Sequence, residues 1–341
     1  MAEMIKEQYS SVSQQNDELF AGCRLPPNSQ ALCIALAEQL FPAEKISQNS
    51  SQGYCSLTLC VGSNLILQCR PPVYQLDMEI LSSAKRVYGK LAPATTFLKS
   101  VPPIDLSVYL MDRIPGIQFR EYRLTNQCNT EWLENLCKGF ARFLAKGWRQ
   151  PLPSSTGQGL VGSSLEARLE AMSTGLPLRF QPLCRNVVRH LNNIKALPWV
   201  LTHGDILDTN IMVDPATGFL YGLVDWAEAE YLPFGVALIG LEEILGQMTA
   251  DGFIYTADAE HLRQTFHHEL RTEIPDLCQP ELQSTVSLAR DLGVLLWHGI
   301  AFDDGLLNRV VQEGRDDSEI AKLDAFLGLK DSQAFKPRPR I

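Results

Sequence analysis

Three oxygen-bearing side chains near the middle of the chain have types and a spacing that suit phosphoryl transfer. Asp205 precedes Asn210 by five positions, and Asp225 ends the apolar run from Phe219 to Val224. Phosphoryl transfer places negative charge on the phosphoryl oxygens, so its catalysis depends on positioning and on compensating charge. Asn210 and Asp225 offer the hard oxygen ligands that Mg²⁺ prefers. Asp205, held on a rigid loop, can orient an attacking hydroxyl and accept its proton.

The sequence around this set predicts the strands that must hold it. An apolar run over residues 199–202 leads into the loop that carries Asp205. Two further β runs, 211–213 and 219–224, are joined by the turn Asp214-Pro-Ala-Thr-Gly218. Each polar residue by itself could be a turn or capping residue. Their joint occurrence between β runs favours a common site.

The motif His203-Gly204-Asp205-x-x-x-x-Asn210, followed by Asp225-Trp226, resembles the aminoglycoside phosphotransferase / choline-kinase-like family. The segment after Asp225 is most similar to the fungal members. The resemblance covers roughly residues 50–330 and is strongest over 199–246. It implies an α+β, protein-kinase-like bilobal fold that uses ATP and Mg²⁺. It also implies that Asp205 is the catalytic base, that Asn210 and Asp225 are the Mg²⁺ ligands, and that His203 fixes the loop by hydrogen bonding.

The same resemblance assigns the nucleotide contacts. The backbone of Asp112 and Ile114 would hydrogen-bond the adenine, and Glu79 stands where the family keeps an ion-pairing Glu. Arg70 takes the place of the usual phosphate-binding Lys, and Arg is a competent phosphate ligand. The loop Ser51-Gln-Gly-Tyr-Cys-Ser56 contains a single Gly and is a weak glycine loop. Arg70 and Glu79 could also be an ordinary surface pair.

Two features favour a small-molecule acceptor over a protein acceptor. Gly204 stands where protein kinases carry an Arg that reads an activation-loop phosphate. About ten residues separate Asp225 from the next predicted helix, a length typical of compact domains that leaves no room for an activation segment. The resemblance therefore implies a kinase that phosphorylates a hydroxyl or an amine of a small metabolite.

Two other readings stay open. The chain could be a catalytically inactive nucleotide-binding module, which the missing Lys and the sparse glycine loop favour. It could also be a biosynthetic enzyme that reuses the cleft for other chemistry, since fold does not fix function. The nearby carboxylates Asp208, Glu228 and Glu230 are expected to be solvated or turn-forming, although Glu228 and Glu230 could aid a second metal.

The pattern along the chain predicts a small sheet-bearing lobe and a larger helical lobe. We expect a polar arm over 1–28, an N-terminal lobe over 29–111, a hinge over 112–116 and a C-terminal lobe over 117–341 with the catalytic loop at 203–210. Strands are expected near Ile46 and over 54–61, 65–69 and 108–111. Helical periodicity predicts helices over these ranges: 29–41, 76–91, 132–144, 165–173, 182–194, 235–249, 258–270, 282–299 and 317–328.

Composition limits the partners and the compartment. The chain has 341 residues and a net charge of −9, so general binding to nucleic acid or to anionic membranes is not expected. The nine cysteines form no C-x-x-C pair, which is typical of a reduced, intracellular protein. Neither a signal peptide nor a membrane span is visible. We therefore expect a cytoplasmic protein with a small-molecule substrate, and the sequence does not indicate its oligomeric state.

Overall fold

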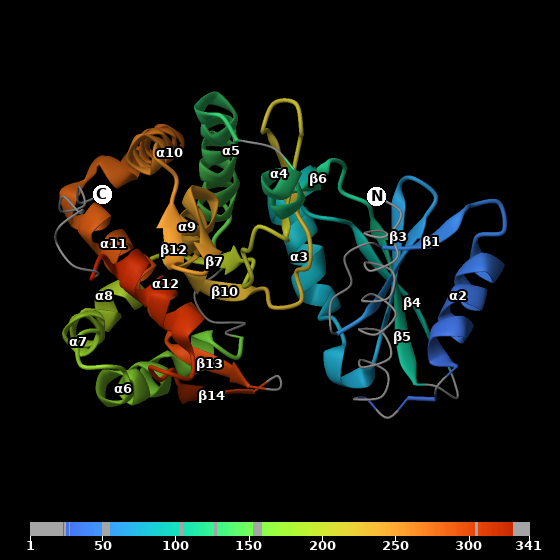
Figure 1. Ribbon diagram of the computed structural model, residues 1–341, viewed down its shortest axis with the longest axis horizontal. Helices are drawn as coiled ribbons and strands as arrows, with labels where there is room; N and C mark the ends of the chain where they lie inside the picture. The colour runs from blue at the N-terminus through green and yellow to red at the C-terminus, as the bar shows by residue number, and fades with distance from the viewer. Residues whose placement is uncertain are drawn as a thin grey trace. The chain divides into compact units, whose positions relative to one another are not determined.

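The computed structural model describes residues 23, 25–26, 28–49, 55–101, 105–125, 128–152, 159–303 and 306–329. The chain divides into two compact units, Met1–Pro115 and Gly116–Ile341 (Figure 1). Most of the predicted arm over 1–28 and the predicted loop residues 51–54 lie outside the described residues. The assignment of 112–116 as a hinge stays a prediction.

The first unit contains a five-stranded antiparallel sheet in the order β1-β2-β3-β5-β4. The predicted hairpin is present as β2 and β3, in the register Leu59↔Leu67. The sequence did not indicate β4, which pairs with β5 at the edge of the sheet. The elements are α2 (Ser29–Leu40), β1 (Ile46–Gln48), β2 (Leu57–Val61), β3 (Leu65–Arg70), η1 (Pro72–Tyr74), α3 (Met78–Tyr88), η2 (Gly89–Leu91), β4 (Thr95–Val101) and β5 (Leu106–Asp112).

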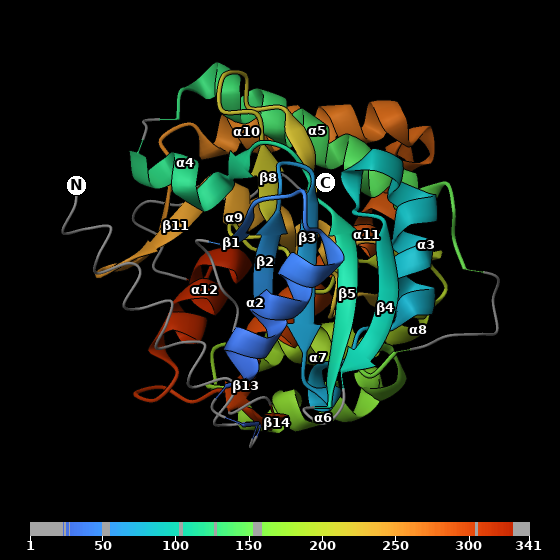
Figure 2. The ribbon, with the colours of Figure 1, turned by 90° about the vertical axis from the view of Figure 1, so that its right-hand side faces the viewer.

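The two faces of this sheet differ in polarity because successive side chains of a strand point to opposite faces. One face forms an apolar core with Cys33, Leu36 and Ala37 of α2, which lies across the sheet in Figure 2. The opposite face is polar near the end of β3, where Gln68 Nε2 donates to Thr58 Oγ1 at 3.3 Å. Helix α3 packs beside β4 and begins with Asp77 as its N-cap.

The second unit is mostly helical and has several short sheets. Strand β8 lies between β6 and β9, β7 pairs with β10, and two further hairpins are β11–β12 and β13–β14. Its elements are β6 (Ile117–Gln118), α4 (Phe119–Thr125), α5 (Thr130–Trp148), η3 (Gly162–Ser164), α6 (Leu165–Gly175), α7 (Gln181–Arg189), α8 (Leu191–Lys195), β7 (Trp199–Thr202), β8 (Ile211–Val213), β9 (Leu220–Leu223), β10 (Glu230–Pro233), η4 (Val236–Ile239), α9 (Gly240–Leu245), β11 (Gly246–Thr249), β12 (Gly252–Tyr255), α10 (Ala259–Glu273), η5 (Pro275–Cys278), α11 (Pro280–His298), β13 (Ile300–Asp303), β14 (Leu306–Val310) and α12 (Asp317–Leu327).

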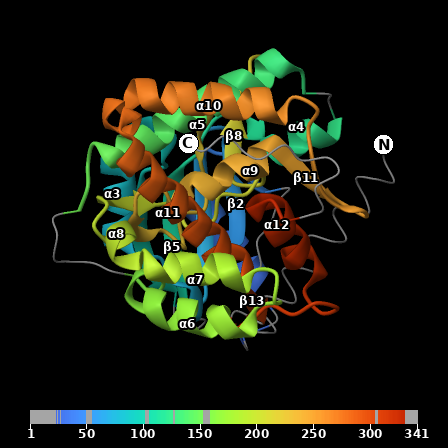
Figure 3. The same cartoon turned by 90° about the vertical axis from the view of Figure 1, so that its left-hand side faces the viewer.

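The long helices of this unit build the core on which the short strands rest. Helices α5 and α10 lie side by side, and α11 packs against α12 (Figure 3). Phe140 and Phe143 of α5 are almost fully buried, and Phe143 reaches the ring of Trp226, with centroids 6.1 Å apart. Trp226 directly follows Asp225, so its contact with α5 holds the segment that comes after β9.

The helix predicted over 235–249 extends four residues beyond the observed end of α9 at Leu245. The chain is helical only to Leu245 and then enters the hairpin β11–β12. Gly246 is extended, and a Cβ atom there would come within 2.4 Å of the Phe253 ring, so the close pairing of the hairpin requires glycine. The predicted helix over 182–194 is divided into α7 and α8 at His190.

None of the helices in the described part of the chain combines the length and the apolarity that a membrane crossing requires.

Candidate functional site

At Gly204, in the loop after β7, the backbone has a conformation and a close contact that require glycine. Gly204 has φ +86°, and a Cβ atom at this position would lie 1.9 Å from the backbone oxygen of Glu228. Next to it, His203 is fully buried and hydrogen-bonds on both sides: Nε2 donates to Val224 O at 2.8 Å, and Nδ1 accepts from Asp205 N at 3.3 Å. Burial lowers the pKa of His203 to about 4, so the ring is neutral near pH 7. His203 thus fixes the loop, as the sequence predicts.

Asp205 and Asn210 are joined by two hydrogen bonds. Asn210 Nδ2 donates to the backbone oxygen of Asp205 and to Asp205 Oδ2, each at 2.9 Å. Both bonds use the amide nitrogen, and this network fixes the orientation of the amide group. The amide oxygen Oδ1 takes part in neither bond, so it is the atom that Asn210 can offer to a cation.

Asp225 lies beside Asn210 because strands β8 and β9 pair with Ile211 opposite Leu223. One residue further, Val224 N donates to Asn210 O at 3.0 Å. Asp225 itself is exposed and has φ +61°, a left-handed conformation that is uncommon outside glycine. Such strained residues concentrate at functional sites. The structure therefore brings together Asp205, Asn210 and Asp225, the three residues that the sequence singled out.

Negative charge accumulates around Asp205. Burial raises the pKa of Asp205 to about 6, and the charges of Asp225, Glu228 and Glu243 add to this effect, while the bond from Asn210 opposes it. A carboxyl group with a pKa near neutrality is suited to general-base catalysis. A site with surplus negative charge is also suited to a bound cation.

The residues fit a magnesium ion that arrives with a nucleotide better than a metal held by protein alone. Within the described ranges, no three His, Cys, Asp or Glu side chains cluster closely enough to hold a metal ion. Mg²⁺ in nucleotide sites is usually held by one or two protein oxygen ligands, with phosphate oxygens and water as the others. The free Oδ1 of Asn210 and the exposed carboxylate of Asp225 match this pattern.

Arg123 of α4 holds the loop over residues 203–210, and the sequence did not indicate this residue. Its Nη1 lies 3.4 Å from Asp208 Oδ2, and its Nη2 donates to the backbone oxygens of Glu243 and Ile244, each at 2.7 Å. Burial lowers the pKa of Arg123, although Asp208 opposes the shift. The expectation that Asp208 is simply solvated or turn-forming is wrong, because this carboxylate anchors the loop to α4. The partners lie 85 and 120 residues away in sequence, so local spacing carries no signal for them.

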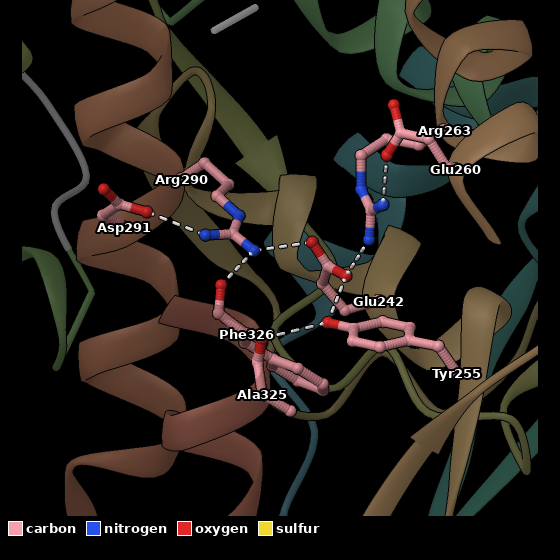
Figure 4. A network of polar contacts seen from close by, with 8 residues as sticks. All are labelled: Glu242, Tyr255, Glu260, Arg263, Arg290, Asp291, Ala325 and Phe326. Atoms are coloured by element: carbon pink, nitrogen blue, oxygen red, sulfur yellow. Dashed lines mark hydrogen bonds and ion pairs between the residues drawn. The ribbon is translucent and has the colours of Figure 1, made fainter. Parts of the chain in front are cut away.

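Helix α9, which supplies the carbonyl groups for Arg123, is itself held by a buried ionic network (Figure 4). Glu242 Oε1 accepts from Arg290 Nη2 at 2.6 Å, and Oε2 accepts from Arg263 Nη2 at 2.9 Å and from Tyr255 Oη at 2.8 Å. Buried carboxylates are tolerated when they are paired and hydrogen-bonded in this way. The network joins α9 to β12, α10 and α11, and through Arg290 to the Phe326 carbonyl of α12.

Glu230 has a structural role rather than the solvated or metal-binding role considered for it. The side chain is buried and accepts from Val161 N at 3.0 Å and from Gly162 N at 2.8 Å. It therefore holds the segment that leads into η3. Glu228, in contrast, is exposed as expected.

Arg70 and Glu79, both in the first unit, differ strongly in burial. Arg70 ends β3 and is only 2% exposed, with Nε donating to Gln68 Oε1 at 3.0 Å and Nη1 to Tyr74 O at 3.3 Å. Glu79 is exposed in the first turn of α3. The reading of these two as an ordinary surface pair is therefore wrong for Arg70. Their roles at a nucleotide stay predictions.

Asp112 and Ile114 lie at the end of β5, where the sequence places the adenine contacts. The backbone N–H of Asp112 donates to Ala94 O at 2.9 Å, so this N–H already has an acceptor. The side chain of Asp112 accepts from Lys85 Nζ of α3 at 3.3 Å, a link that the sequence did not indicate. Ile114 is buried.

A comparison with protein families supports the resemblance on independent grounds. Residues 86–239 match the model of the phosphotransferase enzyme family. This range contains the catalytic loop, Asn210 and Asp225. The predicted resemblance to the aminoglycoside phosphotransferases is thereby confirmed over this part of the chain. A comparison with curated proteins found no significant match.

Solved structures with a similar fold include a GDP complex of wild-type aminoglycoside 2'-phosphotransferase-IIIa. The two chains are 12% identical, and the match covers 79% of this chain and 91% of that one, with a TM-score of 0.53. Choline kinase from Cryptosporidium parvum Iowa II is 11% identical, over 88% of this chain and 95% of that one, with a TM-score of 0.51. At these identities the likeness concerns the fold alone, and it confirms the predicted protein-kinase-like fold.

Proposed function

From the match of residues 86–239 to the phosphotransferase enzyme family, we propose that the protein is an ATP- and Mg²⁺-dependent kinase of a small metabolite. The group that is phosphorylated is a hydroxyl or an amine. The observation that carries the proposal is the pair of hydrogen bonds from Asn210 to Asp205, with Asp225 beside them. These bonds couple Asp205, which would receive the proton, to Asn210, which would hold the metal.

Each residue of this set has a distinct role in the proposal. Asp205 orients the acceptor hydroxyl and takes its proton, and its raised pKa supports this role. Asn210 Oδ1 and Asp225 hold Mg²⁺, which neutralises phosphate charge when it is bound. In the first unit, Arg70 contacts the phosphates in place of a Lys, Glu79 supports Arg70, and the carbonyl of Asp112 with the N–H of Ile114 contacts the adenine.

The geometry around Gly204 supports a small acceptor. A side chain at this position would collide with the Glu228 backbone, so no residue there can read a phosphorylated segment. The chain also returns to strand β10 at Glu230, five residues after Asp225. The cytosol is the compartment in this proposal, which the lack of any C-x-x-C pair among the nine cysteines supports.

A second candidate is a nucleotide-binding protein without turnover. The observation that favours it is the engagement of Arg70, whose buried guanidinium already donates to Gln68 and Tyr74. In this alternative the nucleotide would bind through the metal pair, and Asp205 would have no catalytic task.

Thermal shift assays on the full chain test the nucleotide assignment before any acceptor is known. We expect Mg-ATP to raise Tm, because a ligand that binds only the folded state stabilises it. The shift should disappear when EDTA removes the metal, and Mg-GTP measures the choice of base. The absence of any shift with either nucleotide at millimolar concentration contradicts the proposal. ADP release during incubation with candidate acceptors then separates a kinase from the inactive alternative.

A further inference from the structure

Helix α4 is a short element of the second unit that its aromatic residues fix to the helical core. The side chain of Phe119 is fully buried, and its ring stacks on that of Trp132 in α5, with centroids 5.7 Å apart. Tyr122 also stacks on Trp132, at 4.2 Å. The guanidinium carbon of Arg123 lies 3.9 Å from the centre of the Phe119 ring, a cation–π contact. The core of the unit therefore places this guanidinium group, independently of the loop over residues 203–210.

Asp208 lies between Asp205 and Asn210 in the sequence, and it attaches their loop to α4 through both its backbone and its side chain. The backbone N–H of Arg120 donates to Asp208 O at 3.0 Å, and Arg123 Nη1 lies 3.4 Å from Asp208 Oδ2. Helix α4 also packs against β8, the strand that begins directly after Asn210. The segment that carries the proposed proton acceptor and a proposed metal ligand is thus held by α4 at more than one point.

Helix α9 is connected to the same loop at both of its ends. At its first residue, Gly240, an added Cβ atom would lie 2.6 Å from Ile206 Cγ2, so the loop packs closely there. At its last turn, Arg123 Nη2 donates to the backbone oxygens of Glu243 and Ile244, each at 2.7 Å. Carbonyl groups in the last turn of a helix have no partner within the helix. Arg123 therefore joins the end of α9 to the loop through one guanidinium group.

These contacts require an arginine. A guanidinium group is planar and carries its donors in a fixed fork, so Nη1 and Nη2 can serve acceptors on two elements at once. A lysine offers one ammonium nitrogen on a flexible chain and does not reproduce this geometry. The Arg123 side chain is only 10% exposed, so its removal would leave poorly hydrated acceptors without a donor.

We propose that Arg123 is a positioning residue for phosphoryl transfer, because it fixes the loop that carries Asp205 relative to α9. This role rests on the proposed function. In that reaction the acceptor oxygen bonds to the γ-phosphorus of ATP, the bond from this phosphorus to the ADP oxygen breaks, and the acceptor proton passes to Asp205. A displacement of a reacting group by about 1 Å can cost about a hundredfold in rate. Loss of Arg123 should therefore slow turnover.

Nucleotide affinity should change little when Arg123 is lost. Val224 N donates to Asn210 O at 3.0 Å, and the pairing of β8 with β9 keeps Asn210 beside Asp225. The contacts of Arg123 go to Asp208 and to α9, and not to this pair. A fall in kcat at constant KM for Mg-ATP is thus the signature of a positioning role, and a loss of stability alone does not produce it.

Steady-state kinetics of the full chain test this role. The rate of ADP formation is measured at varied Mg-ATP, with water as the acceptor until a better one is found. We expect Arg123→Met to lower kcat about tenfold to hundredfold and to leave KM for Mg-ATP within about twofold of the wild type. Methionine keeps an unbranched apolar chain near the Phe119 ring but has no donor.

Arg179→Met is the matched control, because Arg179 also binds a carboxylate, that of Asp324, through Nε at 2.7 Å and Nη2 at 3.0 Å. Arg179 lies between α6 and α7, and Asp324 lies on α12, so this pair is outside α4, α9 and the loop. The control should lower the urea midpoint, as Arg123→Met does, and keep kcat at the wild-type value.

Asp208→Asn tests the same contact from the side of the loop. Its amide oxygen can still accept from Arg123 Nη1 but carries no charge, so kcat should fall by less, about threefold to tenfold. The double variant with Arg123→Met should lose no more than Arg123→Met alone, because two partners in one contact are not additive. Arg123→Lys should recover only a small part of kcat. If Arg123→Met does not fold, Asp208→Asn decides the question by the same kinetic signature.

Three results overturn the proposal. The first is a kcat of Arg123→Met, or of Asp208→Asn in its place, that equals the wild type or the Arg179→Met control. The second is a rise in KM for Mg-ATP at unchanged kcat, which would assign Arg123 to nucleotide binding. The third is a loss in the double variant equal to the product of the two single losses.

The wild type separates these failures from a failure of the proposed function. A wild-type chain that shows no Mg-ATP thermal shift, or forms no ADP with water or any candidate acceptor, refutes the kinase assignment and the role of Arg123 with it. A wild-type chain that turns over, together with any of the three results above, refutes the role of Arg123 alone.

Discussion

The loop over residues 203–210 in the second unit and the β3–α3 region of the first unit both carry predicted site residues, but they hold them differently. Asn210 donates two hydrogen bonds to Asp205, and the neighbour of Asp225, Val224, donates its backbone N–H to Asn210 O. Arg70 and Glu79 share no such geometry, because Arg70 is buried against Gln68 and Tyr74 while Glu79 is exposed. The difference teaches that residues close in sequence, on one loop and the strand that follows it, come together through short-range hydrogen bonds, whereas the positions of Arg70 and Glu79 depend on the separate elements that carry them.

The largest effect is expected from Asp205→Asn, which tests the centre of the tightly coupled region. The amide cannot take the proton of the acceptor, so turnover should fall by about 10³-fold or more, in the range typical of an essential general base. The thermal shift with Mg-ATP should remain, because the metal ligands are unchanged. The measurement is ADP formation once an acceptor is found.

Asp251→Asn, in the exposed turn between β11 and β12, is the control and should match the wild type. Unchanged turnover in Asp205→Asn would remove this residue from the mechanism.

The next effect concerns the backbone that holds the loop. Gly204→Ala should destabilise the protein by about 3 kcal/mol or more. The alanine Cβ would collide with the Glu228 backbone oxygen, and a non-glycine residue with positive φ carries a further cost. Urea denaturation measures this change.

Gly314→Ala is the matched control for the backbone conformation. Gly314 has φ +75°, but nothing lies within 4 Å of a Cβ atom there. It should therefore lose only about 1–2 kcal/mol. Equal losses in the two variants would show that the approach of Glu228 is not what constrains the loop.

A smaller effect is expected at the metal pair. Asn210→Ala removes an oxygen ligand, and Asp225→Asn removes the charge of one. Each variant should weaken Mg-ATP binding about tenfold to hundredfold, which is the usual loss of affinity when residues around a metal site are changed. Titration calorimetry with and without Mg²⁺ measures the effect. Binding of metal-free ATP should be unaffected, and an equal loss with and without the metal would argue against a metal role.

The smallest effects belong to the loosely coupled region. Arg70→Met should weaken Mg-ATP binding about tenfold through the loss of one charge-assisted hydrogen bond, and Arg70→Lys should restore part of it. Glu79→Gln should change the affinity by less than about twofold, since Glu79 is exposed and exposed charges contribute little. A larger loss from Glu79→Gln than from Arg70→Met would reverse the comparison between these two positions.

The sequence predicted much of this molecule where the signal is local. The hairpins β2–β3 and β8–β9, the long helices and the Asp205 set follow from short-range periodicity, turn residues and one compact motif. Helix α9 ends earlier than predicted because Gly246 pairs closely with β12, a contact that the helical pattern does not contain.

The supporting side chains could not be predicted for the same physical reason. Arg123 acts on Asp208 and on α9, and Glu242 is held by arginines 21 and 48 residues away. Glu230 holds a segment 68 residues earlier in the chain. A charged residue alone in a sequence gives no indication of such distant partners, and solvation is then the default expectation.

The crowding at Gly204 restricts how this protein could evolve. An arginine that senses a phosphorylated segment cannot be installed by one substitution, because the Glu228 backbone would have to move first. Control through an arginine at this position would therefore require coupled changes at Gly204 and in the segment that carries Glu228.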